Sequence, residues 1–471
     1  MGGHPIVTTL RAVCAATLGV LLLPLSAVAQ DVTFTKDIAP LFQEKCQTCH
    51  RPGTVAPMSL VTYQDARPWA TAIKNRVSTR AMPPWPMDKT VGVQRFKNDI
   101  SLSEEQIATI VRWVDGGAPM GNLADMPAPR EWPDPDAWNY EARFGRPPDL
   151  VISSPSYHVK AGGIDEWPTP EVRIPLTDLS EERWISAIEL RPGNTDSRYA
   201  FHHANPSLIP PTAADDPDRL ERYQLTDSAV GTEGFIFPDD SGKRIVPGSS
   251  VSFGMHLWPL NDRDVDVVLQ IGLWFYPQGD RPKHETEGEV LFQVSQGTRL
   301  GEVARTDRGP TAADKVNPQL VTHSDLLIPP NSVSIIRGVH VLPRNARVHS
   351  LRGHMHFRGK HQVVEVIYPD GRWETLNKLN WDHAWHTAFL YEDDAMPLLP
   401  KGTTLILTSE FDNTRANRYN PDPDQWVAGG RRSADEMSHL RLGITWFSDE
   451  EFAALVAERK ALEARQSQQQ D

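Results

Sequence analysis

Cysteine is almost absent from this 471-residue chain, which has only three, at positions 14, 46 and 49. A scaffold held together by disulfides would need more of them, so that class is excluded. Positive charge is also sparse: Lys and Arg form no dense block, and the formal net charge is -13. The composition therefore argues against nucleic acid or an anionic membrane as the main partner.

Long apolar runs are missing everywhere except at the N-terminus. Arg11 precedes AVCAATLGVLLLPLSAV, which is short for a spanning helix and ends in the small residues Ala27-Val28-Ala29. This pattern predicts a secretory signal peptide over residues 1–29, cleaved after Ala29. An uncleaved anchor is the alternative. Cleavage would leave a periplasmic or secreted protein with no membrane span in its mature chain.

The two remaining cysteines lie in KCQTCHRPG, a C-x-x-C-H motif. Haem attachment requires two thiols at this spacing, here Cys46 and Cys49, and an axial imidazole, here His50. A thioredoxin-like pair or half of a zinc site would not require His50. No second C-x-x-C occurs, and no βαβ pattern surrounds the motif. The motif therefore predicts one covalent haem c.

Helical patterns flank this motif. Apolar residues recur at helical spacing before it, and residues 103–114 begin with a capping box from Ser103 to Gln106. A helix ending in C-x-x-C-H, followed by a closing amphipathic helix, resembles a class I cytochrome c. The resemblance covers residues 31–118 and implies a small all-α domain.

The sixth haem ligand has three candidates. In such cytochromes a methionine usually comes from a loop ahead of the last helix. Met82 is the predicted ligand, because Pro83-Pro84 would stiffen its loop. Met58 and Met87 are the alternatives, and packing of Met82 against the haem edge is the competing structural role.

After residue 118 the composition changes twice. Residues 119–148 are rich in proline and predict a stiff linker. Short alternating apolar runs separated by Pro, Gly, Asn and Asp then predict antiparallel β-structure, enough for two jelly-roll-like sandwiches. The expected multidomain order is an all-α domain followed by two all-β sandwiches. The predicted ranges after the linker are 149–310 for the first sandwich, 311–447 for the second, and 448–471 for a C-terminal helix and tail. This helix is predicted to begin with a capping box from Ser448 to Glu451.

Histidines cluster within the predicted sandwiches. Residues i and i+2 of a strand share a face, so His354 and His356 can both reach one metal ion. Adjacent residues point oppositely, so His202 and His203 can share a metal only at a bulge or strand end. A distant histidine, His256, would complete three nitrogens. A late methionine, Met437, would give an N₂S set that favours Cu(I) over zinc. Each residue also has an ordinary structural role as its alternative.

The order and spacing of these residues resemble the copper type II, ascorbate-dependent monooxygenases. That family has two β-sandwiches facing each other across a solvent cleft. The first holds a three-histidine electron-transfer copper, and the second holds a His₂Met copper where oxygen reacts. The resemblance implies the first copper at His202, His203 and His256, and the second at His354, His356 and Met437. The order of a c-type cytochrome followed by a copper monooxygenase also resembles a bacterial group of proteins in which these domains are fused.

The resemblance implies an oxidoreductase that hydroxylates a C–H bond of an unidentified small organic substrate with O₂. In that family ascorbate reduces the coppers, and the haem is expected to replace this donor or to relay its electrons. An electron donor protein, ascorbate or another small reductant would supply the electrons. A non-catalytic haem and copper electron carrier is one alternative. A zinc hydrolase is another, although it gives Met437 no role and lacks a general base in the motif.

Other polar residues near these motifs are expected to have structural roles. Asp435 and Glu436 either orient the methionine loop or lie in a solvated turn. Six other histidines of the second sandwich are not predicted to be direct ligands, and most of them are expected to be surface or hydrogen-bonded residues: His340, His349, His361, His383, His386 and His439.

Overall fold

The chain is seen in a computed structural model. The predicted signal peptide, with Cys14 and its cleavage site, lies almost entirely outside the residues that the structure describes. None of the helices among the described residues is both long and apolar enough to cross a bilayer. The described residues are 1–3, 32–54, 56–132, 134, 137–163, 165–168, 173–213, 224–226, 228–229, 234–286, 290–293, 326–430 and 432–470.

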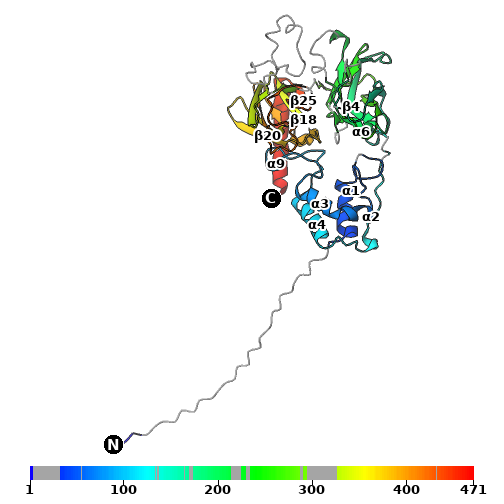
Figure 1. The fold of residues 1–471 in the computed structure, drawn as a ribbon. Helices are drawn as coiled ribbons and strands as arrows, with labels where there is room; N and C mark the ends of the chain where they lie inside the picture. The colour runs from blue at the N-terminus through cyan, green and yellow to red at the C-terminus, as the bar shows by residue number, and fades with distance from the viewer. Residues whose placement is uncertain are drawn as a thin grey trace.

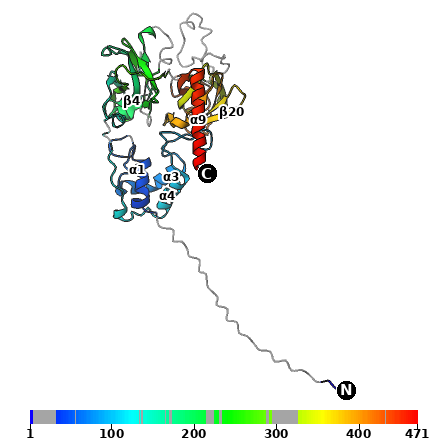
Figure 2. The ribbon, with the colours of Figure 1, turned by 180° about the vertical axis from the view of Figure 1, so that it is seen from behind.

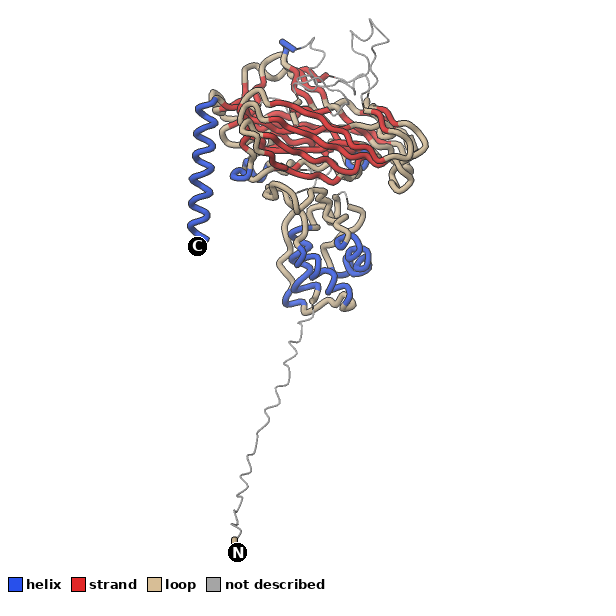
Figure 3. Tube along the Cα trace, turned by 90° about the vertical axis from the view of Figure 1, so that its left-hand side faces the viewer, coloured by secondary structure: helices blue, strands red, loops and turns tan. Residues whose placement is uncertain are grey.

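Most of the helices form one small unit that lies apart from the strands (Figures 1 and 3). The last long helix of this unit begins at the predicted capping box of Ser103 and Gln106 and ends at Gly116. Its buried side chains, Ile110 and Trp113, pack against Phe34. The elements are η1 (Phe34–Ile38), α1 (Ala39–Lys45), α2 (Tyr63–Ala66), η2 (Arg67–Trp69), α3 (Ala70–Ser78), α4 (Glu104–Asp115) and η3 (Leu123–Asp125).

The first half of the β region encloses one apolar core between a large sheet and several small ones. The large sheet has the order β1-β13-β4-β9-β14, and β8 also pairs with β4. The elements, including a short helix just before them, are α5 (Glu141–Phe144), β1 (Leu150–Ser153), β2 (Tyr157–Val159), β3 (Arg173–Pro175), β4 (Arg183–Pro192), α6 (Ser197–Ala200), β5 (Phe201–Ala204), β6 (Ser207–Ile209), η4 (Pro211–Ala213), β7 (Ser228–Ala229), β8 (Gly234–Ile236), β9 (Ser241–Ile245), β10 (Ser250–Ser252), β11 (Met255–Leu257), β12 (Val265–Val267), β13 (Leu269–Phe275) and β14 (His284–Glu285).

The second half encloses its core between two longer-stranded sheets, ordered β17-β23-β19-β20 and β15-β25-β18-β21, with β22 also paired to β18. The β-rich, sandwich-like architecture expected from alternation is therefore observed. The elements are β15 (Val290–Gln293), β16 (Leu327–Ile328), β17 (Val333–Val341), β18 (Asn345–Met355), β19 (Gly359–Ile367), β20 (Trp373–Asn380), β21 (Phe389–Leu390), η5 (Asp393–Ala395), β22 (Leu398–Leu399), β23 (Thr404–Asp412), β24 (Val427–Ala428), β25 (Ser438–Phe447) and α9 (Asp449–Gln470).

Two segments lie outside the ranges predicted for their domains. Strand β15 falls within the predicted first sandwich, 149–310, but pairs with β25 of the second. Alternation predicts a strand and cannot say which sheet it joins. The second segment, residues 85–99, falls within the predicted helical domain, and we call it the docking segment.

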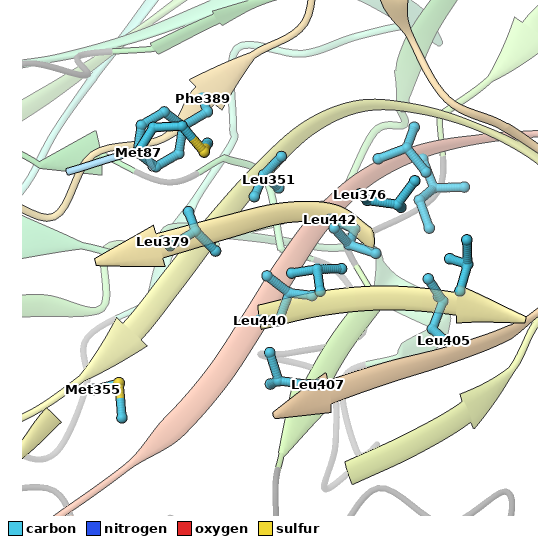
Figure 4. Packing of buried hydrophobic residues seen from close by; sticks show 14 of the residues in the cluster. Met87, Leu351, Met355, Leu376, Leu379, Phe389, Leu405, Leu407, Leu440 and Leu442 are labelled. Carbon is cyan, nitrogen blue, oxygen red and sulfur yellow. The ribbon is translucent and has the colours of Figure 1, made fainter. Parts of the chain in front are cut away.

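The docking segment packs on the edge of the second sandwich. Met87 and Phe96 form β-bridges with that sandwich, to Leu379 and Tyr391 respectively. Figure 4 shows Met87 and Phe389 together with leucines of the same core cluster. The Met87 sulfur accepts a hydrogen bond from Asn377 Nδ2 at 3.6 Å. Met87 is therefore a core residue of the second sandwich, although sequence alone left it as a possible haem ligand.

The linker and the C-terminal helix are also fastened to their neighbours. Buried Glu189 of β4 accepts hydrogen bonds from the backbone N–H groups of Asn139 and Tyr140, at 2.8 and 2.9 Å. Helix α9 begins with the predicted box of Ser448 and Glu451 and runs along the second sandwich (Figure 2). The linker of residues 119–148 is thus anchored at its C-terminal end on the first sandwich.

Candidate metal centre

The histidine doublet lies at a strand end opposite a bulge. Helix α6 leads directly into β5, where His202 and His203 are the second and third residues. Strand β5 pairs with β11 so that His203 lies opposite His256, and the register shifts between His256 and Leu257. This irregularity lets adjacent residues converge: the His202 and His203 ring centroids lie 5.2 and 4.8 Å from that of His256. The doublet therefore lies at a strand end beside a bulge, as sharing of a metal would require, and that sharing stays a prediction.

Hydrogen bonds fix the tautomers of two of these rings. His256 Nε2–H donates to Asp165 Oδ2 at 2.8 Å, and His202 Nε2–H donates to the carbonyl of His383 at 3.2 Å. The Nδ1 atoms of His202 and His256 then face each other at 3.4 Å. A carboxylate behind an imidazole is the usual support of a metal-ligating histidine. Trp167 stacks on His256 at 4.6 Å and shields it.

The second group is assembled by one antiparallel strand pair. His354 lies at the end of β18 and His356 just beyond it, while Met437 directly precedes β25. Because β18 and β25 pair with Met355 opposite Ser438, the histidine motif and the methionine meet at the same end of the sheet. All three side chains are buried. The His354 and His356 ring centroids are 5.1 Å apart.

A buried carboxylate joins these two strand ends. Glu436 is 0% exposed and accepts backbone N–H groups from His356, from Arg358 at 2.9 Å and from Met437 at 3.0 Å. Burial raises the pKa of Glu436 to about 7, although the three N–H donors oppose that rise. Glu436 therefore orients the methionine loop and does not lie in a solvated turn.

The backbone carbonyl of Asp435, the residue before Glu436, orients the ring of His356. Its Nδ1–H donates to the carbonyl oxygen of Asp435 at 3.2 Å. Its Nε2 atom is buried and has no hydrogen-bond partner among the residues that the structure describes. A buried imidazole nitrogen with a lone pair and no donor is the arrangement that a metal ion would satisfy.

The two groups form one continuous cluster. The rings of His203 and His354, from different sandwiches, have centroids only 5.4 Å apart. His386, in the segment between β20 and β21, lies between them: it stacks on His203 at 4.7 Å, and its Nδ1 is 3.4 Å from His354 Nδ1. The resemblance implies a solvent-filled cleft between the two sites. In the structure, the described histidine side chains of the two groups are instead in contact.

Burial keeps five of these imidazoles neutral. It lowers the pKa of His202 to about 4 and that of His356 to about 3, and neighbouring histidines add to the shift. The pKa values of His203, His354 and His386 are held well below their ordinary range for the same two reasons. Neutral imidazole is the metal-binding form, so these five side chains can bind a cation at neutral pH.

The C-x-x-C-H motif follows α1 as a tight turn. The backbone N–H of His50 donates to the carbonyl of Cys46 at 2.9 Å, and both cysteines are half-buried. Burial raises the pKa of the Cys46 thiol to about 12. His50 Nδ1–H donates to the carbonyl of Met58 at 3.2 Å, which leaves Nε2 available as an axial ligand. Met82 lines a small cavity of about 40 Å³ with Ile107 and other residues.

One contact links this turn to the histidine doublet. Arg198 Nη1, in α6, donates to the carbonyl of Gly53 at 2.6 Å. Gly53 lies three residues after His50, and Arg198 lies four residues before His202. The C-x-x-C-H turn therefore touches the helix that leads into the first histidine group.

Sequence reasoning missed two side chains of the cluster. Asp165 sits in GGIDEWP, where a single acidic residue carries no visible signal. It also accepts hydrogen bonds from the backbone and side chain of Ser433, so it connects the two sandwiches. His386 lies in WDHAWH, and its density of histidine and tryptophan was the available signal. It is 1% exposed and lies among the predicted ligands, which differs from its expected surface or hydrogen-bonded role.

No family model matches the chain, and no curated protein matches it. Solved structures resemble it only distantly. The empty particles of cowpea mosaic virus are 9% identical, with a TM-score of 0.27 over 63% of this chain and 89% of that one. PNGase F, a glycosylasparaginase from Flavobacterium meningosepticum, is 10% identical, with a TM-score of 0.25 over 63% and 96%. An oxalate decarboxylase from Lactobacillus farciminis is 9% identical, with a TM-score of 0.14 over 63% and 91%. Similarities this weak do not indicate a family or a function for this chain.

Proposed function

We propose that the protein is an exported copper-dependent monooxygenase that hydroxylates a C–H bond of a small organic molecule with O₂. The observation that carries the proposal is the buried cluster of imidazoles, with buried Met437 at the strand end that pairs beside His354 and His356. His202, His203 and His256 would hold one copper, and His354, His356 and Met437 the other. Imidazole with thioether suits copper better than zinc.

The chain's own residues would prepare these ligands before metal arrives. Asp165 and the Asp435 carbonyl fix the tautomers of His256 and His356, so that a chosen nitrogen of each is free. Glu436 holds the two ends of the second group together. Bound copper would supply one-electron redox chemistry and the reduction of O₂.

The same logic supports a class I cytochrome c in residues 31–118. Cys46 and Cys49 would attach the haem, and His50 would be its proximal ligand, oriented by the Met58 carbonyl. Met82 is the proposed sixth ligand, and this choice is strengthened because Met87 is buried in the second sandwich. Haem c would supply a one-electron carrier fed by a donor protein, ascorbate or another small reductant.

Metal and haem counts test the assignment directly. Anaerobic copper loading should give two coppers and one haem per chain, and turnover under ¹⁸O₂ should place label in a product. His354→Ala and Met437→Ala should abolish product formation while the haem is retained. His340→Ala, on β17 of the same sandwich, is the matched control. Redox cycling without labelled product would identify an electron carrier, and zinc in place of copper would contradict the proposal.

The haem relay has its own test. Gly92 of the docking segment has φ +68°, and a Cβ there would lie 1.9 Å from the carbonyl oxygen of Leu376. Gly92→Ala should therefore displace the helical unit and slow haem reoxidation when reduced protein meets O₂ in stopped-flow mixing. Gly116→Ala, whose φ is -76° and whose nearest contact is 3.2 Å, is the control. The relay is wrong if the wild-type haem does not reoxidise within one turnover.

A further inference from the structure

His386 occupies a position that neither proposed copper site uses. It belongs to the second sandwich, yet its ring lies 4.6 Å from that of His202 and 4.7 Å from that of His203, both in the first sandwich. On its other side, its Nδ1 is 3.4 Å from His354 Nδ1. One imidazole therefore contacts histidines of both groups.

The nitrogens around His386 are arranged to bind a cation. His202, His203 and His386 each offer a ring nitrogen, and these three atoms lie within 4.8 Å of one another. His386 Nε2 and both ring nitrogens of His203 are buried without a hydrogen-bond partner among the described residues. Leaving buried polar atoms unpaired is costly, and a shared metal ion would satisfy them together.

We propose that His386 is a metal ligand contributed across the interface, binding the same ion as His202 and His203. This inference rests on the proposed function, because it requires copper at the histidine doublet. It adds a ligand that the family resemblance does not supply. It also makes the centre inter-domain, since a metal held by both sandwiches fastens one to the other.

Copper titration of the full-length holoprotein tests the ligand. We expect His386→Ala to weaken Cu(II) binding at the doublet by at least about tenfold, since even indirect support of a ligand is worth that much. Binding at His354, His356 and Met437 should persist. The nitrogen superhyperfine pattern of the Cu(II) electron paramagnetic resonance spectrum should also lose one coupled nitrogen. His202→Ala is the positive control and His361→Ala, half-buried on β19, the negative one.

Small-angle scattering and thermal unfolding test whether the metal ion holds the two sandwiches together. Copper should lower the radius of gyration or raise the unfolding temperature of the wild type more than that of His386→Ala. His386→Gln, which keeps the side-chain size, guards against a folding defect and should behave like the alanine variant. Unchanged copper affinity and spectra in both variants, with His202→Ala impaired, would overturn the inference and leave the proposed function intact. A wild type that binds no copper would overturn both.

Discussion

Replacing Glu436 by glutamine should destabilise the two strand ends that hold His356 and Met437, although it changes no proposed ligand. One carboxylate oxygen accepts the N–H groups of His356 and Met437, and the other accepts that of Arg358. Glutamine keeps one oxygen and turns an NH₂ toward at least one N–H donor. A buried donor left unpaired costs about 1–3 kcal/mol, so Glu436→Gln should destabilise the second sandwich by that amount at pH 8.

Hydrogen exchange rates measure this loss of stability at the individual backbone amides. The amides of His356, Arg358 and Met437 should exchange faster in Glu436→Gln, while amides in the middle of β18 should exchange more slowly than these. Asp435→Asn is the matched control, because the Asp435 side chain pairs with Arg432, which is largely exposed. Such surface pairs are worth about 0–1 kcal/mol. Equal exchange and equal urea stability in wild type and Glu436→Gln would refute the proposed role of Glu436.

Three further changes probe the packing between units. Burial lowers the pKa of His349 to about 3, below the ordinary 6.5, so the unfolded chain takes up this proton first and stability falls as pH drops from 6.5 toward 3. His349→Leu should flatten that acid slope by about 1.4 kcal/mol per pH unit in urea titrations, and an unaltered slope would contradict this account. Phe96→Ala should cost about 3–5 kcal/mol, because the ring is 5% exposed in the second sandwich core, and should speed proteolysis of the docking segment. Arg347→Ala should cost about 1.5–3 kcal/mol in thermal unfolding, because it removes two hydrogen bonds to Asp240 across the sandwiches, at 2.6 and 3.1 Å; no loss would show that this ion pair is inert.

Local structural features could be predicted from the sequence wherever residues close together in the chain determine them. The capping boxes at Ser103 and Ser448 use atoms three residues apart, and both were predicted where they occur. The need for a bulge beside His202 and His203 followed from the two-residue repeat of a strand. These predictions required no knowledge of distant partners.

Long-range pairing was not readable in the same way. Strand β15 could belong to either sandwich by its pattern, and only pairing with β25 decides. Asp165 and His386 join the cluster through contacts more than ninety positions along the chain, to His256 and His202. No periodicity records such contacts, so their roles could not be inferred from spacing.

The docking segment affects how the protein could be divided. It lies between Met82 and helix α4, yet Phe96 belongs to the core of the second sandwich. A fragment starting after the linker would lack that ring and leave the edge beside Phe389 and Tyr391 uncovered. A fragment ending before the linker would expose Phe96 to water. The helical unit and the second sandwich are therefore interdependent in folding, and a foreign domain could replace the helical unit only if it brought its own copy of this segment.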